Sequence, residues 1–438
     1  MRRLSQLEQL QLLPYIAKWL LLASAVAVPA GTASAFFLFS LDHVTQWREA
    51  HGWAIWLLPL AGFAVGLIYH WLGKPVDAGN NLIIDEIHDP RKTVPLRMVP
   101  LVLGGTLVSH MFGASVGREG TAVQMGGALA DQLTRLLRLR REDRRIMLMA
   151  GISAGFASVF GTPLAGAIFG LEVLAIGRMR YDALLPCMVA AIVADQVGLA
   201  WGVVHVHYAI GEVAPVQFWS MMAVVAAGIL FGLAGLLFAT ATHRLGAWVK
   251  KLIAYPPLRP LVGGTLIAIA VWVLDAHQYI GLGIPSIVQS FQVPMAPWDW
   301  LGKLLFTVLS LGTGFKGGEV TPLFYIGATL GNALAPLLHL PFAMLAGIGF
   351  VAVFAGAANT PLATIIMAME LFGPQIAPFA AIACIASYLV SGHAGIYNAQ
   401  RVGQNKHQAH LPEELRLGEV KQYRAQKLST KAKVEPRD

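Results

Sequence analysis

The chain has 438 residues, of which 56% are apolar and 13% are charged. A soluble domain carries about 25% charged residues, so this composition excludes an ordinary soluble protein and predicts an all-α protein with many membrane spans. The net charge is +8. Nucleic acid is one usual partner of basic patches, but in so apolar a chain anionic lipid headgroups explain them more simply.

Apolar runs recur along the chain and mark the predicted helices. A straight span needs about 20 apolar residues, yet several runs are shorter and are interrupted by glycine and proline. Such runs are typical of tilted or broken helices that carry unwound backbone into a protein-lined cavity. The runs are residues 13–41, 54–72, 99–112, 146–174, 184–203, 221–239, 261–274, 301–311, 340–357 and 376–390.

The basic residues gather in the connecting loops and near the C-terminal end. Six arginines fall between Arg135 and Arg145, and lysines and arginines are frequent after residue 400. By the positive-inside rule, this loop and the end of the chain face the cytoplasm. We therefore expect a cytoplasmic N-terminal segment (residues 1–13), a single transmembrane domain (14–400) and a cytoplasmic basic tail (401–438).

Several motifs occur twice, in the same order and about 200 residues apart. The pattern G-x-E-x-T stands at Gly117–Thr121 and again at Gly317–Thr321, and Thr-Pro-Leu-Ala stands at 162–165 and 360–363. Two related halves, residues 14–203 and 217–390, are therefore expected within the one domain.

Further pairs support the repeat. A glutamate follows each Thr-Pro-Leu-Ala motif at the same spacing, Glu172 in the first half and Glu370 in the second. Equal spacing in both halves favours a structural role for these two side chains, linking helices. Residues 79–83 likewise parallel residues 281–285.

Each G-x-E-x-T motif places a lone glutamate and several bare amides at the start of an apolar run. Both are costly at membrane depth unless they line an ion pathway. A dehydrated anion needs donors that replace its water, and helix N-termini supply free N–H groups and a positive dipole end. Four segments fit as helix starts around such an anion: residues 79–81, 117–121, 317–322 and 394–397.

These motifs resemble the CLC family of chloride channels and antiporters over residues 20–400. The resemblance is carried by Gly117–Gln124, Gly318–Pro322, the two Thr-Pro-Leu-Ala helices and Tyr397. It implies a CLC-type fold of two inverted-topology repeats, a homodimer with one pathway in each subunit, and an anion held at helix N-termini. It also implies that Glu119 is the gate, which occupies an anion site when ionised and swings away with a proton when protonated.

The departures from the family pattern point to one branch. The usual Gly-Ser-Gly-Ile-Pro is Gly-Asn-Asn-Leu-Ile at residues 79–83, and Val173 stands where chloride antiporters carry an inner glutamate. Together the departures resemble the bacterial fluoride/proton antiporter branch (CLC-F). This implies a protein of the bacterial inner membrane that exports fluoride from the cytoplasm in exchange for protons.

Physical chemistry supports fluoride only in part. The Asn80 amide offers two donors where serine offers one, and Thr321 adds a hydroxyl. Both features suit a small, strongly hydrated anion, but they do not exclude chloride. A chloride-permeable channel or a chloride/proton exchanger is therefore the alternative.

The candidate site residues fall into three groups. Glu119 and Glu319 are expected to transfer protons, and Glu319 either receives the proton on the cytoplasmic side or bonds Thr321 to shape the loop. Asn80 can cap the short helix that follows it and still contact the anion, whereas the alternative for Asn81 is a helix cap or a structural bond. The residues expected to contact the anion are Asn80, Asn81, Gly120, Val320, Thr321 and Tyr397, with ring edges of Phe324 and Tyr325 beside them.

An enzyme is the competing class of protein. An intramembrane hydrolase needs a nucleophile with a base, or a set of metal ligands. The 13 histidines form no H-E-x-x-H pattern, and no G-x-S-x-G elbow is expected. We expect no enzyme activity, no metal and no cofactor. The expected partners are fluoride, protons, membrane lipids and a second copy of the chain, and not nucleic acid.

Overall fold

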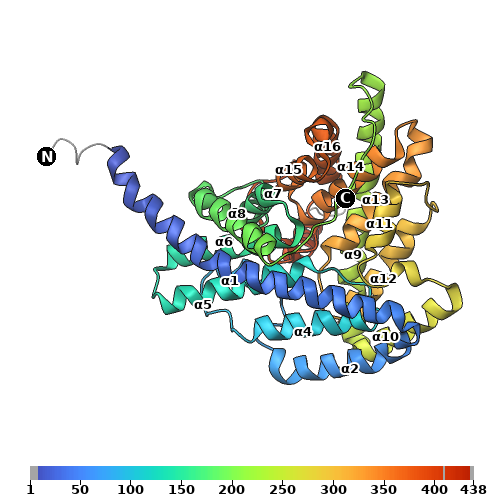
Figure 1. Ribbon diagram of the computed structural model, residues 1–438, viewed down its shortest axis with the longest axis horizontal. Helices are drawn as coiled ribbons and strands as arrows, with labels where there is room; N and C mark the ends of the chain where they lie inside the picture. The colour runs from blue at the N-terminus through green and yellow to red at the C-terminus, as the bar shows by residue number, and fades with distance from the viewer. Residues whose placement is uncertain (1–7, 408–409, 435–438) are drawn as a thin grey trace.

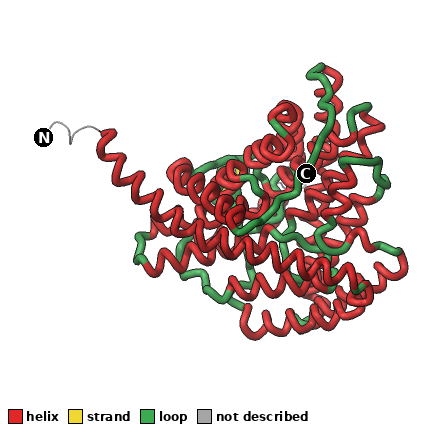
Figure 2. The backbone as a smooth tube through the Cα atoms, in the orientation of Figure 1, coloured by secondary structure: helices red, strands yellow, loops and turns green. Residues whose placement is uncertain are grey.

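The structure is a computed structural model that describes residues 8–407 and 410–434. These residues form seventeen α-helices, several 3₁₀ turns, one π-helical turn and three two-residue strands, so most of the tube in Figure 2 is helical. The all-α prediction is confirmed. In the first half the helices are α1 (Glu8–Ala50), α2 (Leu58–Ile68), α3 (Asn80–His88), α4 (Met98–Met111), α5 (Glu119–Leu136), α6 (Arg141–Phe160), α7 (Pro163–Glu172) and α8 (Leu184–Ala200).

The second half contains eight further helices, and one more follows in the tail. They are α9 (Phe218–Leu252), α10 (Leu258–Leu274), α11 (Ile284–Ser290), α12 (Asp299–Thr313), α13 (Val320–Leu338), α14 (Phe342–Ala358), α15 (Pro361–Phe372), α16 (Ala377–Val390) and α17 (Val420–Val434). The strands are β1 (Ala175–Ile176), β2 (Arg401–Val402) and β3 (Leu415–Arg416).

The helix lengths match the interrupted apolar runs. Among the described residues, 5 helical segments are long and apolar enough to cross a membrane, namely 12–50, 52–73, 181–200, 218–252 and 320–338. The other apolar helices have 10–17 residues, which is shorter than a straight span requires. The expectation of many broken or partial spans is therefore confirmed.

The two halves pack side by side around a shared interior. In Figure 1, α1 runs along α6 and α8, while α9 and α12–α16 form the opposite side of the molecule. Helix α5 packs along α6, and α13 packs along α14 in the corresponding way. Glycines make both crossings close: a Cβ on Gly126 would collide with the Gly151 carbonyl oxygen, and one on Gly327 would collide with that of Gly349. Small residues at crossings let membrane helices approach closely.

A reciprocal pair of carboxylates joins the halves at α7 and α15. Glu172 at the end of α7 accepts hydrogen bonds from the amides of Leu362 and Ala363, at 3.0 and 2.8 Å. Glu370 accepts bonds at 2.9 and 2.8 Å from the corresponding amides, Leu164 and Ala165. Each carboxylate thus satisfies free N–H groups at the start of the other helix. The linking role expected for this pair is confirmed.

The segment after α16 is folded against the body. Strand β2 pairs in parallel with β1 from the first half, and β3 pairs antiparallel with β2. Arg178 forms ion pairs with Glu413 and Glu414, and Arg416 pairs with Asp85 at 2.7 Å. The beginning of the predicted tail is therefore an ordered extension of the helical domain.

Candidate functional site

The two G-x-E-x-T motifs meet backbone to backbone in the interior. The Gly117 amide donates to the Gly318 carbonyl at 2.6 Å, and the Gly318 amide donates to the Gly117 carbonyl at 2.7 Å. Glycine is needed because a Cβ on Gly117 would lie 2.8 Å from the Glu119 carboxylate, and one on Gly318 would lie 2.8 Å from the Gly120 nitrogen. The starts of α5 and α13 are thereby held together.

Glu119 is buried in a cluster of donors supplied by both halves. Its side chain is 1% exposed. One carboxylate oxygen accepts from the amides of Arg118 and Thr321, both at 3.1 Å, and the other accepts from the Thr321 hydroxyl. The Arg118 Nε lies 3.8 Å from the carboxylate. These donors at a helix start are the type that binds anions, so the carboxylate occupies a place suited to a free anion.

The motif residues divide between two cavities. Gly317 and Glu319 line a cavity of about 270 Å³, which we call the Asn80 cavity. Arg118 and Thr321 line a second cavity of about 20 Å³, which we call the Tyr208 cavity. Glu119 hydrogen-bonds to Arg118 and Thr321, so its carboxylate is attached to the wall of the smaller cavity.

The Asn80 cavity brings together several of the predicted residues. Asn80, Asn81, Glu319 and Tyr397 all line it. The Asn80 carboxamide oxygen is buried without a hydrogen-bond partner in the described structure. Its nitrogen faces Gly120, where a Cβ would lie 3.2 Å away. Asn80 does not cap α3, because Gly79 is the N-cap and no side chain bonds the helix start.

Asn81 makes a different contact from Asn80. Its carboxamide oxygen accepts a hydrogen bond from the Ala399 amide at 2.9 Å. The side chain thus holds the segment that carries Tyr397 against the start of α3. This contact is the structural bond that was the alternative for Asn81 to a direct anion contact.

One predicted helix start is wrong. Residues 394–397 begin no helix, and residues 391–400 are irregular in the described structure. Side chains and strand-like contacts hold this segment instead: the Ile396 amide donates to the Ala357 carbonyl at 2.9 Å, and Gln400 donates to the carbonyls of Val173 and Ala358, both at 3.1 Å. Tyr397 is therefore placed by a loop and is 5% exposed.

The predicted residues of the second half lie in different places. Thr321 does not bond Glu319, because its amide and its hydroxyl both donate to Glu119. Val320 is the buried first residue of α13. Phe324 lines the Tyr208 cavity and stacks on Phe350 with ring centroids 3.9 Å apart. Tyr325 lies away from both cavities, against Gly283 and beneath the Lys303 ammonium at 5.3 Å.

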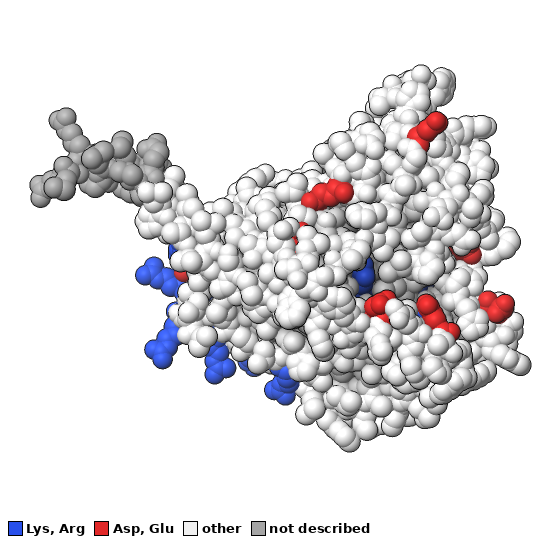
Figure 3. Space-filling view, in the orientation of Figure 1, with Lys and Arg blue, Asp and Glu red and all other residues white. Residues whose placement is uncertain are grey.

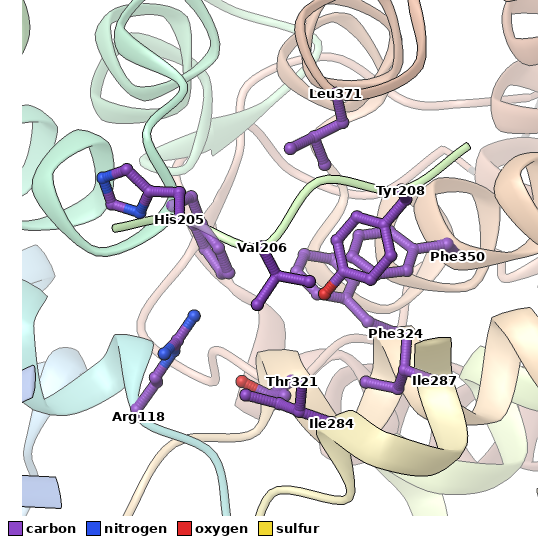
Figure 4. A pocket seen from close by; sticks show the side chains of 11 residues that line it. Arg118, His205, Val206, Tyr208, Ile284, Ile287, Thr321, Phe324, Phe350 and Leu371 are labelled. Atoms are coloured by element: carbon purple, nitrogen blue, oxygen red, sulfur yellow. The ribbon is translucent and has the colours of Figure 1, made fainter. Parts of the chain in front are cut away.

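Sequence reasoning missed three polar residues of the Tyr208 cavity, along with most of its apolar lining. Arg118, His205 and Tyr208 all line the cavity (Figure 4). The last two come from residues 203–217, the connection between the halves. The available signal was the presence of two histidines and a tyrosine within four residues, His205 to Tyr208, in a connection whose other residues are mostly apolar.

The hydrolase pattern also needs correction. G-x-S-x-G occurs at Gly113–Gly117 and at Gly151–Gly155. Neither serine pairs with a base: Ser115 shares a hydrogen bond with Thr307 at 2.8 Å, and Ser153 donates to the Ala167 carbonyl at 3.4 Å. No cluster of three or more metal-binding side chains occurs in the part of the chain that the structure describes.

Comparison with known proteins identifies the family. The profile described as "Voltage gated chloride channel" matches residues 61–392. A "Chloride/fluoride channel protein" of Pseudomonas syringae is 81% identical over 425 residues, 96% of this chain and 94% of the relative. An "H(+)/Cl(-) exchange transporter ClcA" of Vibrio vulnificus is 26% identical, covering 80% of this chain and 81% of the relative.

Solved structures agree with the sequence relatives. A CLC-type fluoride/proton antiporter has a TM-score of 0.85 at 35% identity, covering 88% of this chain and 98% of that chain. A cyanobacterial Cl⁻/H⁺ antiporter shares the fold with a TM-score of 0.74 at 22% identity, covering 85% and 94%. The CLC-type fold predicted from the sequence is confirmed, and this chain belongs to the voltage-gated chloride channel (CLC) family of membrane anion transporters.

Proposed function

We propose that the protein exports fluoride in exchange for protons, with Glu119 as gate and proton carrier. The observation that carries this proposal is the Glu119 carboxylate, which lies among amide and hydroxyl donors of both halves as a bound anion would. The solved structure that is 35% identical is a fluoride/proton antiporter, and the Pseudomonas relative is named for both chloride and fluoride.

The proposed cycle follows from competition for these donors. Ionised Glu119 holds the Arg118 and Thr321 donors and closes the path. Protonation removes the charge that attracts those donors, so the side chain leaves with its proton and a fluoride from the Asn80 cavity takes the same donors. The proton then passes to Glu319, which lines that cavity. Asn80, Gly120, Val320 and Tyr397 surround the anion on this side.

The orientation rests on charge. Lysine and arginine side chains gather at one edge of the molecule, near the ends of α1, α5 and α6, and acidic residues lie mostly elsewhere on the same face (Figure 3). We assign this edge to the cytoplasm by the positive-inside rule. The transmembrane domain, residues 14–400, then lies in a bacterial inner membrane, with residues 1–13 and 401–438 on its cytoplasmic side. Residues 1–7, 408–409 and 435–438 of these segments lie outside the described residues. A homodimer follows from family resemblance.

A flux experiment tests the exchange. Purified protein in liposomes should move fluoride and protons in opposite directions, recorded together with a fluoride electrode and an internal pH dye. Glu119→Gln should lower proton movement to the level of protein-free liposomes, while Glu212→Gln, at an exposed glutamate of the 203–217 connection, should leave the coupling unchanged. Passive fluoride flux without proton movement in the unaltered protein would reject exchange.

The second candidate is a chloride-permeable channel or chloride/proton exchanger on the same scaffold. It is favoured by the relatives named as chloride exchangers. The same liposomes decide between the two when chloride replaces fluoride: equal initial rates for the two halides would favour the alternative, and a fluoride rate at least tenfold higher would favour fluoride export.

A further inference from the structure

We propose that the Tyr208 cavity is a second anion-binding site. Fluoride binds there on its way from Glu119 to the solution on the side of the membrane opposite the Arg135–Arg145 loop. The proposal rests on the proposed function, and it names the residues along which fluoride would leave the protein. The cavity volume of about 20 Å³ accommodates a single water-sized particle, which matches a dehydrated fluoride.

The cavity is formed by the connection between the halves. In Figure 4 the segment carrying His205, Val206 and Tyr208 crosses above Arg118 and Thr321 and closes the space over them. The Tyr208 ring is fixed by aromatic neighbours, with its centroid 5.2 Å from that of Phe291 and 5.4 Å from that of Phe350. The hydroxyl is therefore held in one direction, and it points into the cavity.

A cation with a free donor faces the same space. The Arg118 Nε is buried and has no hydrogen-bond partner in the described structure. Its charge is offset by Glu119, 3.8 Å away. When Glu119 leaves its place, this guanidinium loses its counter-charge while staying mostly buried. A small anion beside the guanidinium would restore the balance and accept the free N–H bond.

The donors therefore lie one after another along the proposed path of fluoride. Fluoride released from the Thr321 hydroxyl at the floor of the cavity meets Arg118 on one side and the Tyr208 hydroxyl above. Apolar side chains form the remaining wall, namely Phe160, Val206, Ile284, Ile287, Phe324, Phe350 and Leu371. His205 also lines the cavity, and its Nε2 lies 3.9 Å from the Asp195 carboxylate. That carboxylate adds negative charge behind the imidazole and helps to confine the anion site to the Arg118 side.

The sharpest test removes one oxygen atom. Tyr208→Phe keeps the ring packing and deletes the hydroxyl, while Tyr181→Phe removes the hydroxyl of an exposed tyrosine. Fluoride transport is measured in right-side-out and in inverted membrane vesicles of the full-length protein. Because a bond to a charged partner contributes enough for roughly a tenfold change in affinity, Tyr208→Phe should raise half-saturation by fluoride roughly tenfold at the Tyr208-cavity face only. Tyr181→Phe should change neither face.

A charge test does not depend on the tyrosine. Val206 also points into the cavity (Figure 4), so Val206→Asp places a carboxylate where the anion is proposed to pause, and Val206→Asn has the same size without the charge. The Asp variant should slow fluoride movement at least tenfold more than the Asn variant, with the proton-to-fluoride ratio unchanged.

The outcomes separate the two proposals. If the unaltered protein moves no fluoride, the proposed function fails. If it exchanges fluoride for protons, but Tyr208→Phe leaves half-saturation within twofold at both faces and the two Val206 variants transport alike, only the second anion site is overturned. Equal changes at both faces would also overturn it, because they would indicate altered packing.

Discussion

Thr321 donates to the Glu119 carboxylate with both its amide and its hydroxyl, although the two residues lie in opposite halves of the chain. The contact lies beside the mutual backbone bonds of Gly117 and Gly318. The proposed gate belongs to neither half alone, since its carboxylate comes from the first repeat and two of its donors come from the second.

Removing the Thr321 hydroxyl should slow transport. Thr321→Val keeps the side-chain shape but deletes a donor to a charged group, which contributes about 1.5–3 kcal/mol. The same hydroxyl serves the carboxylate and, in the proposed cycle, the fluoride that replaces it. We expect initial fluoride rates in liposomes to fall roughly tenfold or more. Thr321→Ser should retain most of the rate, and an unimpaired Val variant would show that this hydroxyl is dispensable.

Adding one methyl group at Gly318 should disable the site. The new Cβ would lie 2.8 Å from the Gly120 nitrogen, and backbone atoms on both sides leave little room to relax. Forced overpacking costs about 1–3 kcal/mol, so Gly318→Ala should lower the melting temperature in detergent and abolish coupled transport. The matched control is Gly104→Ala in α4, where a Cβ meets nothing within 4 Å. A fully active Gly318→Ala protein would contradict the close contact of the two motifs.

Losing the Asn81 carboxamide should loosen the Tyr397 segment. In Asn81→Leu the Ala399 amide loses its acceptor, and a buried unpaired donor costs about 1–3 kcal/mol. Hydrogen exchange of residues 394–400 should quicken in this variant, and fluoride transport should slow. Asn81→Asp keeps an acceptor oxygen and serves as the control for hydrogen exchange, but not for transport, because its carboxylate would repel fluoride in the Asn80 cavity. Unchanged protection of these residues in the Leu variant would mean that other contacts hold the segment.

Replacing either of the reciprocal carboxylates, Glu172 or Glu370, should lower the stability of the protein. Glu172→Gln and Glu370→Gln each replace one accepting oxygen with an NH₂ group that faces backbone amides, so both should lower the melting temperature in detergent. Glu172→Gln should lower the melting temperature more than Glu370→Gln, because Glu172 is buried whereas Glu370 is only partly covered. Glu49→Gln, at an exposed side chain, is the control. A stabilising effect of either substitution would contradict the reciprocal capping.

Acid should release the segment after α16. The Lys406 amide donates to the His393 Nε2 at 3.3 Å, which requires an unprotonated nitrogen. Burial, and then the positive charges of Lys406, His407 and Arg424, lower the pKa of His393 from 6.5 to about 4. A released imidazole therefore takes a proton before the docked one does. The docking free energy is complete above pH 6.5 and falls as the pH drops from about 6.5 to 4.

Hydrogen exchange measures this release. Corrected for the intrinsic effect of pH, exchange of residues 400–407 should quicken as the pH falls through this window. His393→Gln carries no titrating ring and should remove most of that pH dependence. An equal response in both proteins would assign the acid sensitivity to other groups.

Much of the protein could be predicted from local pattern. The apolar runs, the repeat offset of about 200 residues and the excess of glycine determined an all-α membrane protein of two halves, because membrane depth and helix packing act on composition and spacing. The Glu172 and Glu370 pair could be read in the same way, since equal spacing after equal helix starts indicates equal roles.

Other features were decided only by tertiary structure. Asn80 and Asn81 are neighbours in sequence, yet one faces Gly120 and the cavity while the other holds Ala399. Tyr397 reaches the site from a loop rather than a helix start, and His205 and Tyr208 come from a connection that belongs to neither repeat. Each of these positions depends on contacts between residues far apart in the chain, and no local periodicity records the direction in which a single side chain points.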